Sequence, residues 1–238
     1  MRRPAAVTAL FALAALVPAG CVSLRRSPEV RFFVLRALVE PPAVLETPPA
    51  GQLGLLPARV PAALARPQLV SAPAPGELRV DPLVRWAEPL DEGVTRTLAE
   101  NLGALLPRQR VLRWPWPAGA SLRARLSVEL QAFGPQPDGV GLRGELTLLD
   151  PKSERALVRR SFALARPTLA PPASGGGTRG RPGTAERETV EAMSALLADL
   201  ARLAAQSVAE LPPAENPASP SGSGAGSESG SGTAVPGH

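Results

Sequence analysis

Apolar and polar residues alternate along residues 121–133, and this period of two predicts a strand with one buried and one wet face. The alternation resumes at residues 140–149 and continues less regularly at 156–165. Turn-forming residues separate the runs, and Asp138-Gly139 is a hairpin signal. We therefore expect an antiparallel meander of three strands. Its inward positions are expected to be Leu122, Ala124, Leu126, Val128, Leu130, Val140, Leu142, Gly144, Leu146, Leu148, Ala156, Val158, Phe162 and Leu164, with Arg160 as an anomaly.

Two longer stretches have the apolar spacing of a helix. Apolar residues from Val94 to Leu106 recur mainly at three- and four-residue steps, which predicts a helix with Pro89 in its first turn and Pro107 at its end. A second helix is expected over residues 184–211, with Thr184 as its cap. The apolar stripe of the second helix comprises Val190, Met193, Leu197, Leu200, Ala204, Val208 and Leu211.

Shorter strands are expected before the first helix. Residues 31–38 are β-prone, and residues 52–60 have the pattern of a strand in which Pro57 indicates an edge position or a bulge. Residues 67–72 and 77–84 flank a proline-rich turn and predict a hairpin. Together these elements predict a mixed α/β fold with a largely antiparallel sheet and two main helices.

The N-terminus has the pattern of a lipoprotein signal peptide. Arg2 and Arg3 precede an apolar run over residues 5–17, which is shorter than the roughly 20 residues that span a bilayer. Small residues then lead to Cys21, the only cysteine, whose thiolate can take up a diacylglyceryl group. The alternative is an ordinary signal peptide cut near Ala19. We expect acylation of Cys21, with chains such as palmitate. By analogy with sorting in Gram-negative bacteria, the absence of Asp after Cys21 indicates the outer membrane, with the domain in the periplasm.

Composition divides the chain into four parts. Residues 1–20 are the expected signal peptide, and residues 21–29 are a short tether. The folded domain is expected at residues 30–211, with a flexible Pro/Gly-rich loop at 167–183. Residues 212–238 are rich in Ser, Gly and Pro and are expected to be a disordered tail.

Composition also excludes several classes of function. The formal net charge is +5, and about +3 remains once Arg2 and Arg3 leave, which is too little for a nucleic-acid-binding surface. The only histidine is His238, and acylation consumes the only thiol. We therefore expect no His-dependent nucleophile, no metal site and no cofactor. Carboxylate-only chemistry stays open, but Glu129 and Glu145 fall on predicted wet faces, so we expect no enzyme.

Two segments of the sequence resemble motifs of a known family. One runs from Leu53 to Val70 and contains Leu-Ala-Arg-Pro-Gln-Leu-Val, and the other, residues 85–90, reads Arg-Trp-Ala-Glu-Pro-Leu. Both are similar to segments of the ABC-type transport auxiliary lipoproteins, the PqiC/YmbA family. Trp114-Pro115-Trp116 lies where members have a Tyr-Pro-Trp-like strand end. The sequence departs from the family pattern at Ala65, where Asp is commoner.

The resemblance implies a periplasmic accessory subunit of an MCE-type lipid-transport system. Its partners would be an MCE-domain protein and, through it, an inner-membrane ABC permease and ATPase. Self-association into a ring is also implied. The fold would be similar to the TolB N-terminal and anticodon-binding-like arrangement. The alternatives are an outer-membrane assembly lipoprotein of the LptE kind and, after it, an Asp/Glu-dependent envelope enzyme.

The candidate docking residues come from these motifs. Trp and Arg anchor protein interfaces more often than other residues do. Trp114 and Trp116 either pack on the meander or contact a partner or lipid. The full set for docking is Arg66, Pro67, Gln68, Arg85, Trp86, Glu88, Pro89, Trp114 and Trp116, beside Cys21 for lipid attachment.

The same motif residues also have a purely structural interpretation. Trp86 would anchor the core before the helix, and Glu88 would serve the N-terminus of that helix. Arg85 would bridge a carboxylate. The segment 66–68 would only mark the entry of a strand.

Overall fold

The structure, a computed structural model, describes residues 29–40, 51–168 and 183–212. The predicted signal peptide with Cys21 lies outside the described residues, and so do the predicted tail beyond residue 212 and most of the predicted loop at 167–183.

Every described helix and strand lies between Arg31 and Ala209. The elements in chain order are β1 (Arg31–Phe33), β2 (Gly51–Leu55), β3 (Gln68–Ala74), β4 (Glu77–Trp86), α2 (Leu90–Leu105), β5 (Gln109–Arg113), β6 (Leu122–Gln136), β7 (Gly139–Leu149), β8 (Ala156–Arg166) and α3 (Thr184–Ala209).

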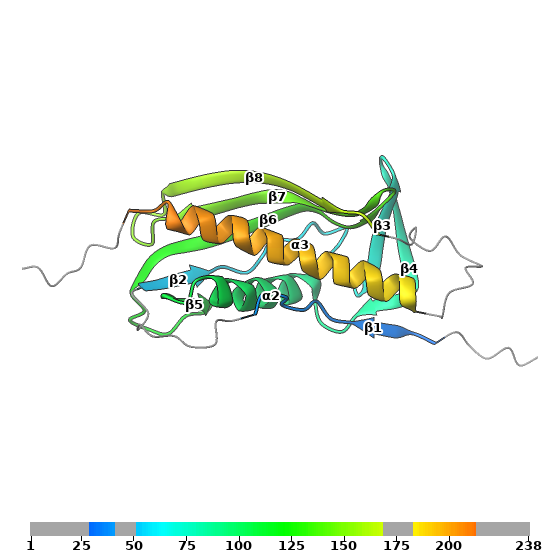
Figure 1. Ribbon diagram of the computed structural model, residues 1–238, viewed down its shortest axis with the longest axis horizontal. Coiled ribbons are helices and arrows are strands. Elements are labelled where there is room, and N and C mark those ends of the chain that lie inside the picture. Colours follow the sequence, from blue (N-terminus) through cyan, green and yellow to red (C-terminus); the bar gives the residue numbers. More distant parts are fainter. Residues whose placement is uncertain (1–28, 41–50, 169–182, 213–238) are drawn as a thin grey trace, which may run out of the picture. The chain divides into compact units, whose positions relative to one another are not determined.

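The strands form two mixed sheets (Figure 1). One has three strands in the order β1-β4-β3, and the other has five in the order β5-β2-β6-β7-β8. The predicted meander is confirmed, because β6, β7 and β8 pair antiparallel with Val128 opposite Leu146 and Leu142 opposite Leu164. The strand β2 pairs parallel with both β5 and β6. The mixed α/β class expected from the sequence is therefore confirmed.

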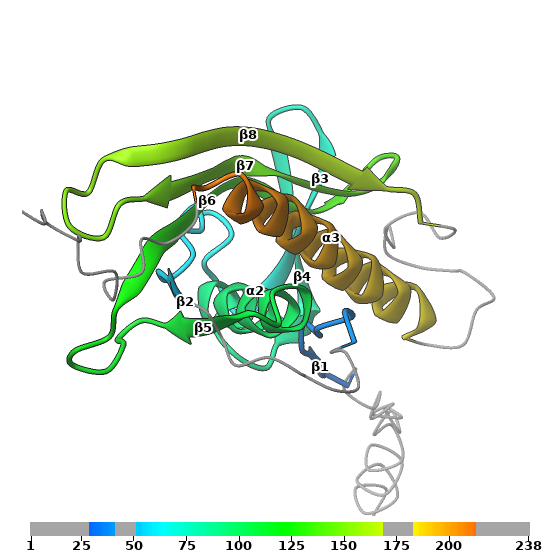
Figure 2. The ribbon, with the colours of Figure 1, turned by 60° about the vertical axis from the view of Figure 1, so that its left-hand side comes forward.

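The two helices of the described part, α2 and α3, supply the apolar surface that covers the larger sheet. The long helix α3 lies across the meander strands and contacts all three, and α2 packs beside α3 (Figure 1, Figure 2). The predicted stripe is buried from Val190 to Val208 of α3 and at Leu211, which follows the end of the helix at Ala209. Since burial of apolar area is the main favourable contribution to folding, α3 and the meander form the centre of the core. The largest fully buried side chains are Leu35, Leu53, Leu55, Leu98, Leu102, Leu126, Leu142, Leu146, Leu148, Met193, Leu196 and Leu197.

The predicted strand at residues 31–38 is wrong beyond Phe33. The strand β1 ends there, and residues 34–40, which we call the strap, have no strand partner among the described residues. Alternation of exposed and buried side chains along the strap produced the strand-like pattern, with Leu35 almost fully buried at 2% exposure. Side chains of the helices, rather than another strand, form hydrogen bonds with the backbone of the strap.

The interpretation of Pro57 is partly wrong. It does not mark an edge, because β2 lies between β5 and β6. After Leu55 the chain still bonds to β6, through Leu56 N–H to the Leu126 carbonyl and Arg59 N–H to the Val128 carbonyl, both at 2.9 Å. Between these two hydrogen bonds, the segment after β2 advances by three residues while β6 advances by two. That extra residue at Pro57 is the bulge that the sequence indicated.

The caps of both helices differ from the expectations. Pro89 is the N-cap of α2 rather than a first-turn residue, and its carbonyl accepts the Gly93 N–H at 2.9 Å. The expected cap of α3, Thr184, is already helical. The N-cap is Gly183 in the left-handed conformation, with φ of +93°, and it offers no capping side chain.

Two further features of the larger sheet differ from the expectations. The strand β5 was not expected, because a five-residue segment with only Val111 and Leu112 as apolar residues has no periodic signal. Ala156 was expected to point inward but is exposed. The β7–β8 register shifts between Leu148 and Leu149, and the bulge reverses the inward side at the start of β8. The anomalous Arg160 forms an ion pair with Glu210.

Alanine at two glycines should change stability in opposite directions. A Cβ at Gly144 in β7 would overlap the Glu129 carbonyl oxygen and lie 2.9 Å from the Phe162 ring. Gly103 in α2 has nothing within 4 Å of that position. Chemical denaturation should show Gly144→Ala lowering the free energy of unfolding by about 1–3 kcal/mol. Gly103→Ala should raise it by about 0.5–1 kcal/mol. Equal effects at both positions would contradict this reading of the packing.

A bidentate ion pair joins β1 to the first turn of α3. The Arg31 guanidinium donates to the two carboxylate oxygens of Glu186 at 2.7 and 3.2 Å. Burial raises the pKa of Glu186, but the hydrogen bond from Arg31, a backbone hydrogen bond and the Arg31 charge together lower it below its ordinary value of 4.5. The carboxylate is therefore stabilised in its charged form.

The Glu186 pair should make stability fall in acid. A lowered folded-state pKa means that the stabilisation is present above the unfolded-state pKa and is lost as pH falls through the folded-state value. The deficit of Glu186→Gln in the free energy of unfolding should be about 1 kcal/mol near pH 7 and should shrink progressively as the pH falls below 4.5. Glu191→Gln, at an exposed site of α3 without an ion pair among the described residues, is the control. A deficit independent of pH would contradict the assignment.

Candidate functional site

The two sequence motifs converge on one pocket of about 380 Å³. The first motif contributes the end of the loop before β3, and the second contributes the end of β4 and the start of α2. A backbone hydrogen bond joins them, because the Trp86 N–H donates to the Pro67 carbonyl at 2.7 Å. Gln68 pairs with Arg85 across β3 and β4. The pocket is lined by Ala65, Arg66, Pro67, Trp86, Ala87, Glu88, Pro89, Leu90 and Asp91.

The pocket has a buried apolar base and an exposed, charged rim. Trp86 is 7% exposed and belongs to the core, so its expected anchoring role is confirmed. Leu90 is also buried, whereas Arg66 and Asp91 are exposed. A concave apolar base with a few polar groups at its edge is the usual form of a binding site. The strand-entry interpretation of residues 66–68 also holds, because β3 begins at Gln68.

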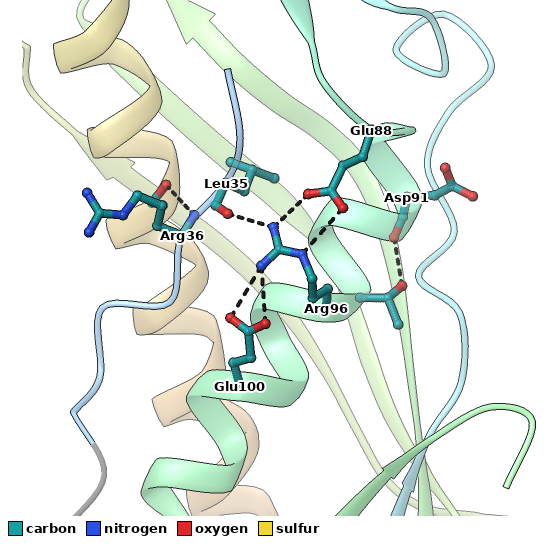
Figure 3. Close-up of polar contacts among 8 residues, drawn as sticks. Leu35, Arg36, Glu88, Asp91, Arg96 and Glu100 are labelled. Atoms are coloured by element: carbon teal, nitrogen blue, oxygen red, sulfur yellow. Dashed lines mark hydrogen bonds and ion pairs between the residues drawn. The ribbon is translucent and has the colours of Figure 1, made fainter. Parts of the chain in front are cut away.

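Glu88, which lines the pocket, is held in place by Arg96 of α2 (Figure 3). The Arg96 guanidinium donates to Glu88 at 2.6 and 3.3 Å and to Glu100 at 3.2 and 3.3 Å. It also donates to the Leu35 carbonyl of the strap at 2.7 Å. The hydrogen bonds that Arg96 donates to Glu88 are the largest influence on the pKa of Arg96 and raise it. Glu88 therefore does not cap the helix as expected, since its carboxylate binds Arg96 and no side chain caps α2.

The strap is fixed between the two helices by further side chains. Asn101 of α2 accepts the backbone N–H groups of Leu38 and Val39 through its Oδ1, both at 3.0 Å. Ser194 of α3 accepts the Arg36 N–H at 3.2 Å. Sequence analysis missed these contacts because each joins residues more than 60 positions apart. The only available signal was that Asn101 and Ser194 are polar residues at positions where the helical pattern predicts apolar ones.

The expected carboxylate partner of Arg85 is not found in the described part of the chain. Arg85 is half-buried at the end of β4, and its Nε lacks a hydrogen-bond partner there. Phe32 of β1 pairs with it in register on one side and Gln68 on the other.

The tryptophan pair lies near the start of α2, where Trp114 lines a hollow together with Asp91 and Glu92. Trp114 is 54% exposed, and its ring meets that of Trp116 edge-to-face, with centroids 4.9 Å apart. Trp116 is half-buried and lies 3.1 Å from where a Cβ of Gly54 would be, so it covers β2. Trp116 thus packs on the domain, and Trp114 is available for contact. A second hollow of about 580 Å³ contains Pro57, Asp91, Glu92, Thr95, Arg113, Trp114 and Pro115.

The two candidate carboxylates lie on neighbouring strands of the larger sheet. Glu129 and Glu145 face each other in register across β6 and β7, and Glu145 is paired with Arg159 at 3.4 Å. Glu129 is exposed on the outer face, as the alternation predicted. Over residues 29–40, 51–168 and 183–212, no group of His, Cys, Asp and Glu could hold a metal ion. None of the described helices is long and apolar enough to cross a membrane.

Solved structures with the same fold are known, at low sequence identity. One uncharacterised protein has 20% identity and a TM-score of 0.57, and the match covers 76% of this chain and 99% of that one. A protein of Xanthomonas campestris from the family DUF330 has 17% identity and a TM-score of 0.55, with coverage of 75% and 95%. No curated protein matches the sequence.

The family assignment comes from a family model. The model of the ABC-type transport auxiliary lipoprotein component matches residues 33–210, which include both motifs, the meander and both helices. The match spans most of the chain and every described strand except part of β1. The chain belongs to the ABC-type transport auxiliary lipoprotein family.

Proposed function

We propose that this protein is a non-catalytic accessory subunit of an MCE-type ABC system for lipid transport between membranes. In this proposal acyl chains on Cys21 anchor it to the outer membrane, and the domain works in the periplasm. Its direct partner is an MCE-domain protein, which connects it to the inner-membrane permease and ATPase. The family membership supports a transport role, and the resemblance of the two motifs supports the MCE partner.

The observation that carries the docking mechanism is the convergence of the two motifs on one pocket. Residues 65–67 and 86–91 are separated in sequence, yet they form a concave surface with Trp86 beneath it and Arg66 on its rim. A partner side chain inserted there would be desolvated by the apolar base and oriented by the charged edge. Such central, desolvated contacts contribute most of the binding free energy in protein interfaces.

Charge reversal at the rim should disrupt the complex without disturbing the fold. The Arg66 side chain is exposed and its guanidinium has no ion pair within the described residues, so Arg66→Glu should leave the thermal midpoint unchanged. Recovery of the MCE-domain protein from solubilised membranes should fall at least about tenfold, which corresponds to 1.4 kcal/mol. Arg79→Glu, at an exposed arginine of β4 outside the pocket, should bind as wild type.

The same experiment separates the proposal from its alternative. Recovery of an outer-membrane barrel in place of an MCE-domain protein would support an assembly role of the LptE kind. Wild-type recovery with Arg66→Glu would overturn the docking role of the pocket. Ring formation by this chain stays a prediction, and light scattering of the purified lipoprotein in detergent measures it.

A further inference from the structure

The outward side of β1 and the strap carries a strip of exposed apolar side chains. Phe32, Val34 and Leu38 are 63%, 44% and 40% exposed. They make up three of the seven large apolar side chains exposed in the described part of the chain, and they fall within seven consecutive positions. Arg36 lies between them, is exposed and has no ion pair within that part. Figure 3 shows its side chain directed away from Arg96. We call these four residues the outer strip.

Hydrogen bonds and the burial of Leu35 hold the backbone beneath the outer strip in place. Leu35 is buried beneath it, and its carbonyl accepts a hydrogen bond from Arg96. Asn101 and Ser194, both almost fully buried, hold the backbone at residues 36, 38 and 39. The odd-numbered side chains therefore face the helices, and the even-numbered ones must face outward. Exposure of the apolar groups is built into the fold.

The position of the strip in the chain identifies what covers it. Cys21 precedes Arg31 by ten residues, and an extended chain spans at most about 3.5 Å per residue, so β1 starts within roughly 35 Å of the acylated residue. This step rests on the acylation of Cys21 in the proposed function. Residues 22–38 contain four arginines and one glutamate, a net charge of +3. Basic segments beside a lipid anchor are attracted to anionic headgroups.

A protein partner fits the strip less well than a lipid surface does. A stable protein interface buries about 800 Å² on each partner, and three partly exposed side chains fall well short of this. A tethered surface needs much less intrinsic affinity, because the tether keeps its effective concentration high. We propose that the outer strip lies against the anionic surface of the membrane that holds the acyl chains of Cys21. The contact sets the orientation of the domain on that membrane.

Site-directed fluorescence on the full lipoprotein tests the orientation. Acylation consumes the only native thiol, so a single introduced cysteine can be labelled alone with an environment-sensitive dye. We would compare Val34→Cys with Leu157→Cys, whose parent residue is 47% exposed on β8. β8 and β1 lie on opposite sides of the domain in both ribbon views (Figure 1, Figure 2). The labelled proteins are reconstituted into vesicles of phosphatidylethanolamine and phosphatidylglycerol.

Dye at position 34 should be quenched several-fold more by nitroxide-labelled lipid than dye at position 157, and several-fold less by aqueous iodide. Equal quenching at the two positions would overturn the inference. Shielding of position 34 from both quenchers would also overturn it, because protein would then cover the strip. A mass spectrum without acyl chains on Cys21 would overturn the anchoring itself, so the two failures are distinguishable.

Discussion

Replacing Leu197 by alanine should lower the free energy of unfolding by about 3–4 kcal/mol, because the side chain is fully buried in the middle of α3. The core consists mainly of leucine, and aromatic residues make up only 3% of the chain. The removed methyl groups therefore leave a cavity among side chains that already pack against both a helix and the sheet. The loss includes the transfer free energy of the removed atoms and the cost of that cavity.

Leu203→Ala provides the matched control on the same helix. Leu203 is only partly buried against the core, so we expect a loss of about 1 kcal/mol. Urea denaturation followed by circular dichroism gives both values. Equal losses would mean that α3 is not packed across the meander as described.

Asn101→Ala should lower the free energy of unfolding by about 2–3 kcal/mol, a large effect for a polar residue. The Asn101 side chain is fully buried, and its Oδ1 accepts two strap N–H groups that would lose their acceptor. An unsatisfied buried donor costs about 1–3 kcal/mol, because it loses hydration without gaining a partner. Exchange of the Leu38 and Val39 amide hydrogens should accelerate in the variant, since the strap is then free to open locally.

Thr97→Val is the control for this effect, one turn earlier on α2. Thr97 is also fully buried, but its hydroxyl lacks a hydrogen-bond partner in the described structure. Replacing it by an apolar group of the same shape should be neutral or slightly stabilising. A loss at Thr97 equal to that at Asn101 would show that burial alone, and not the hydrogen bonds to the strap, determines the result.

The elements that could be predicted from the sequence are those with a long periodic signal. The strands β6 and β7, with their hairpin at Gly139, and the stripe of α3 appear where expected because many alternating positions support each of them. Short elements could not be predicted, because they lack such a signal. β5 has five residues, and a segment of that length contains too few positions to show a period. The strap imitates a strand because its alternation comes from packing between helices rather than from pairing.

The candidate site also contains features that could be predicted from the sequence and features that could not. The residues of the two motifs were identified from the sequence, and Trp86 is where its structural interpretation placed it. The partner of Glu88 was not identified, because Arg96 lies eight positions further along the chain, about two turns into the helix. Arg96 pairs with Glu100 one turn later, and it also binds Glu88 and the strap. An arginine with five donors can join several segments, and a pairwise rule cannot show which ones.

The sequence by itself determined the family, the α/β class and the faces of the long elements, because each depends on residues that are close in the chain or on a motif that is continuous. Only the tertiary structure decided that two separate motifs share one pocket, that the strap is locked between α2 and α3, and that its apolar side faces outward. Such contacts join residues far apart along the chain. Their energies depend on burial and distance in space, and neither quantity can be obtained from local patterns.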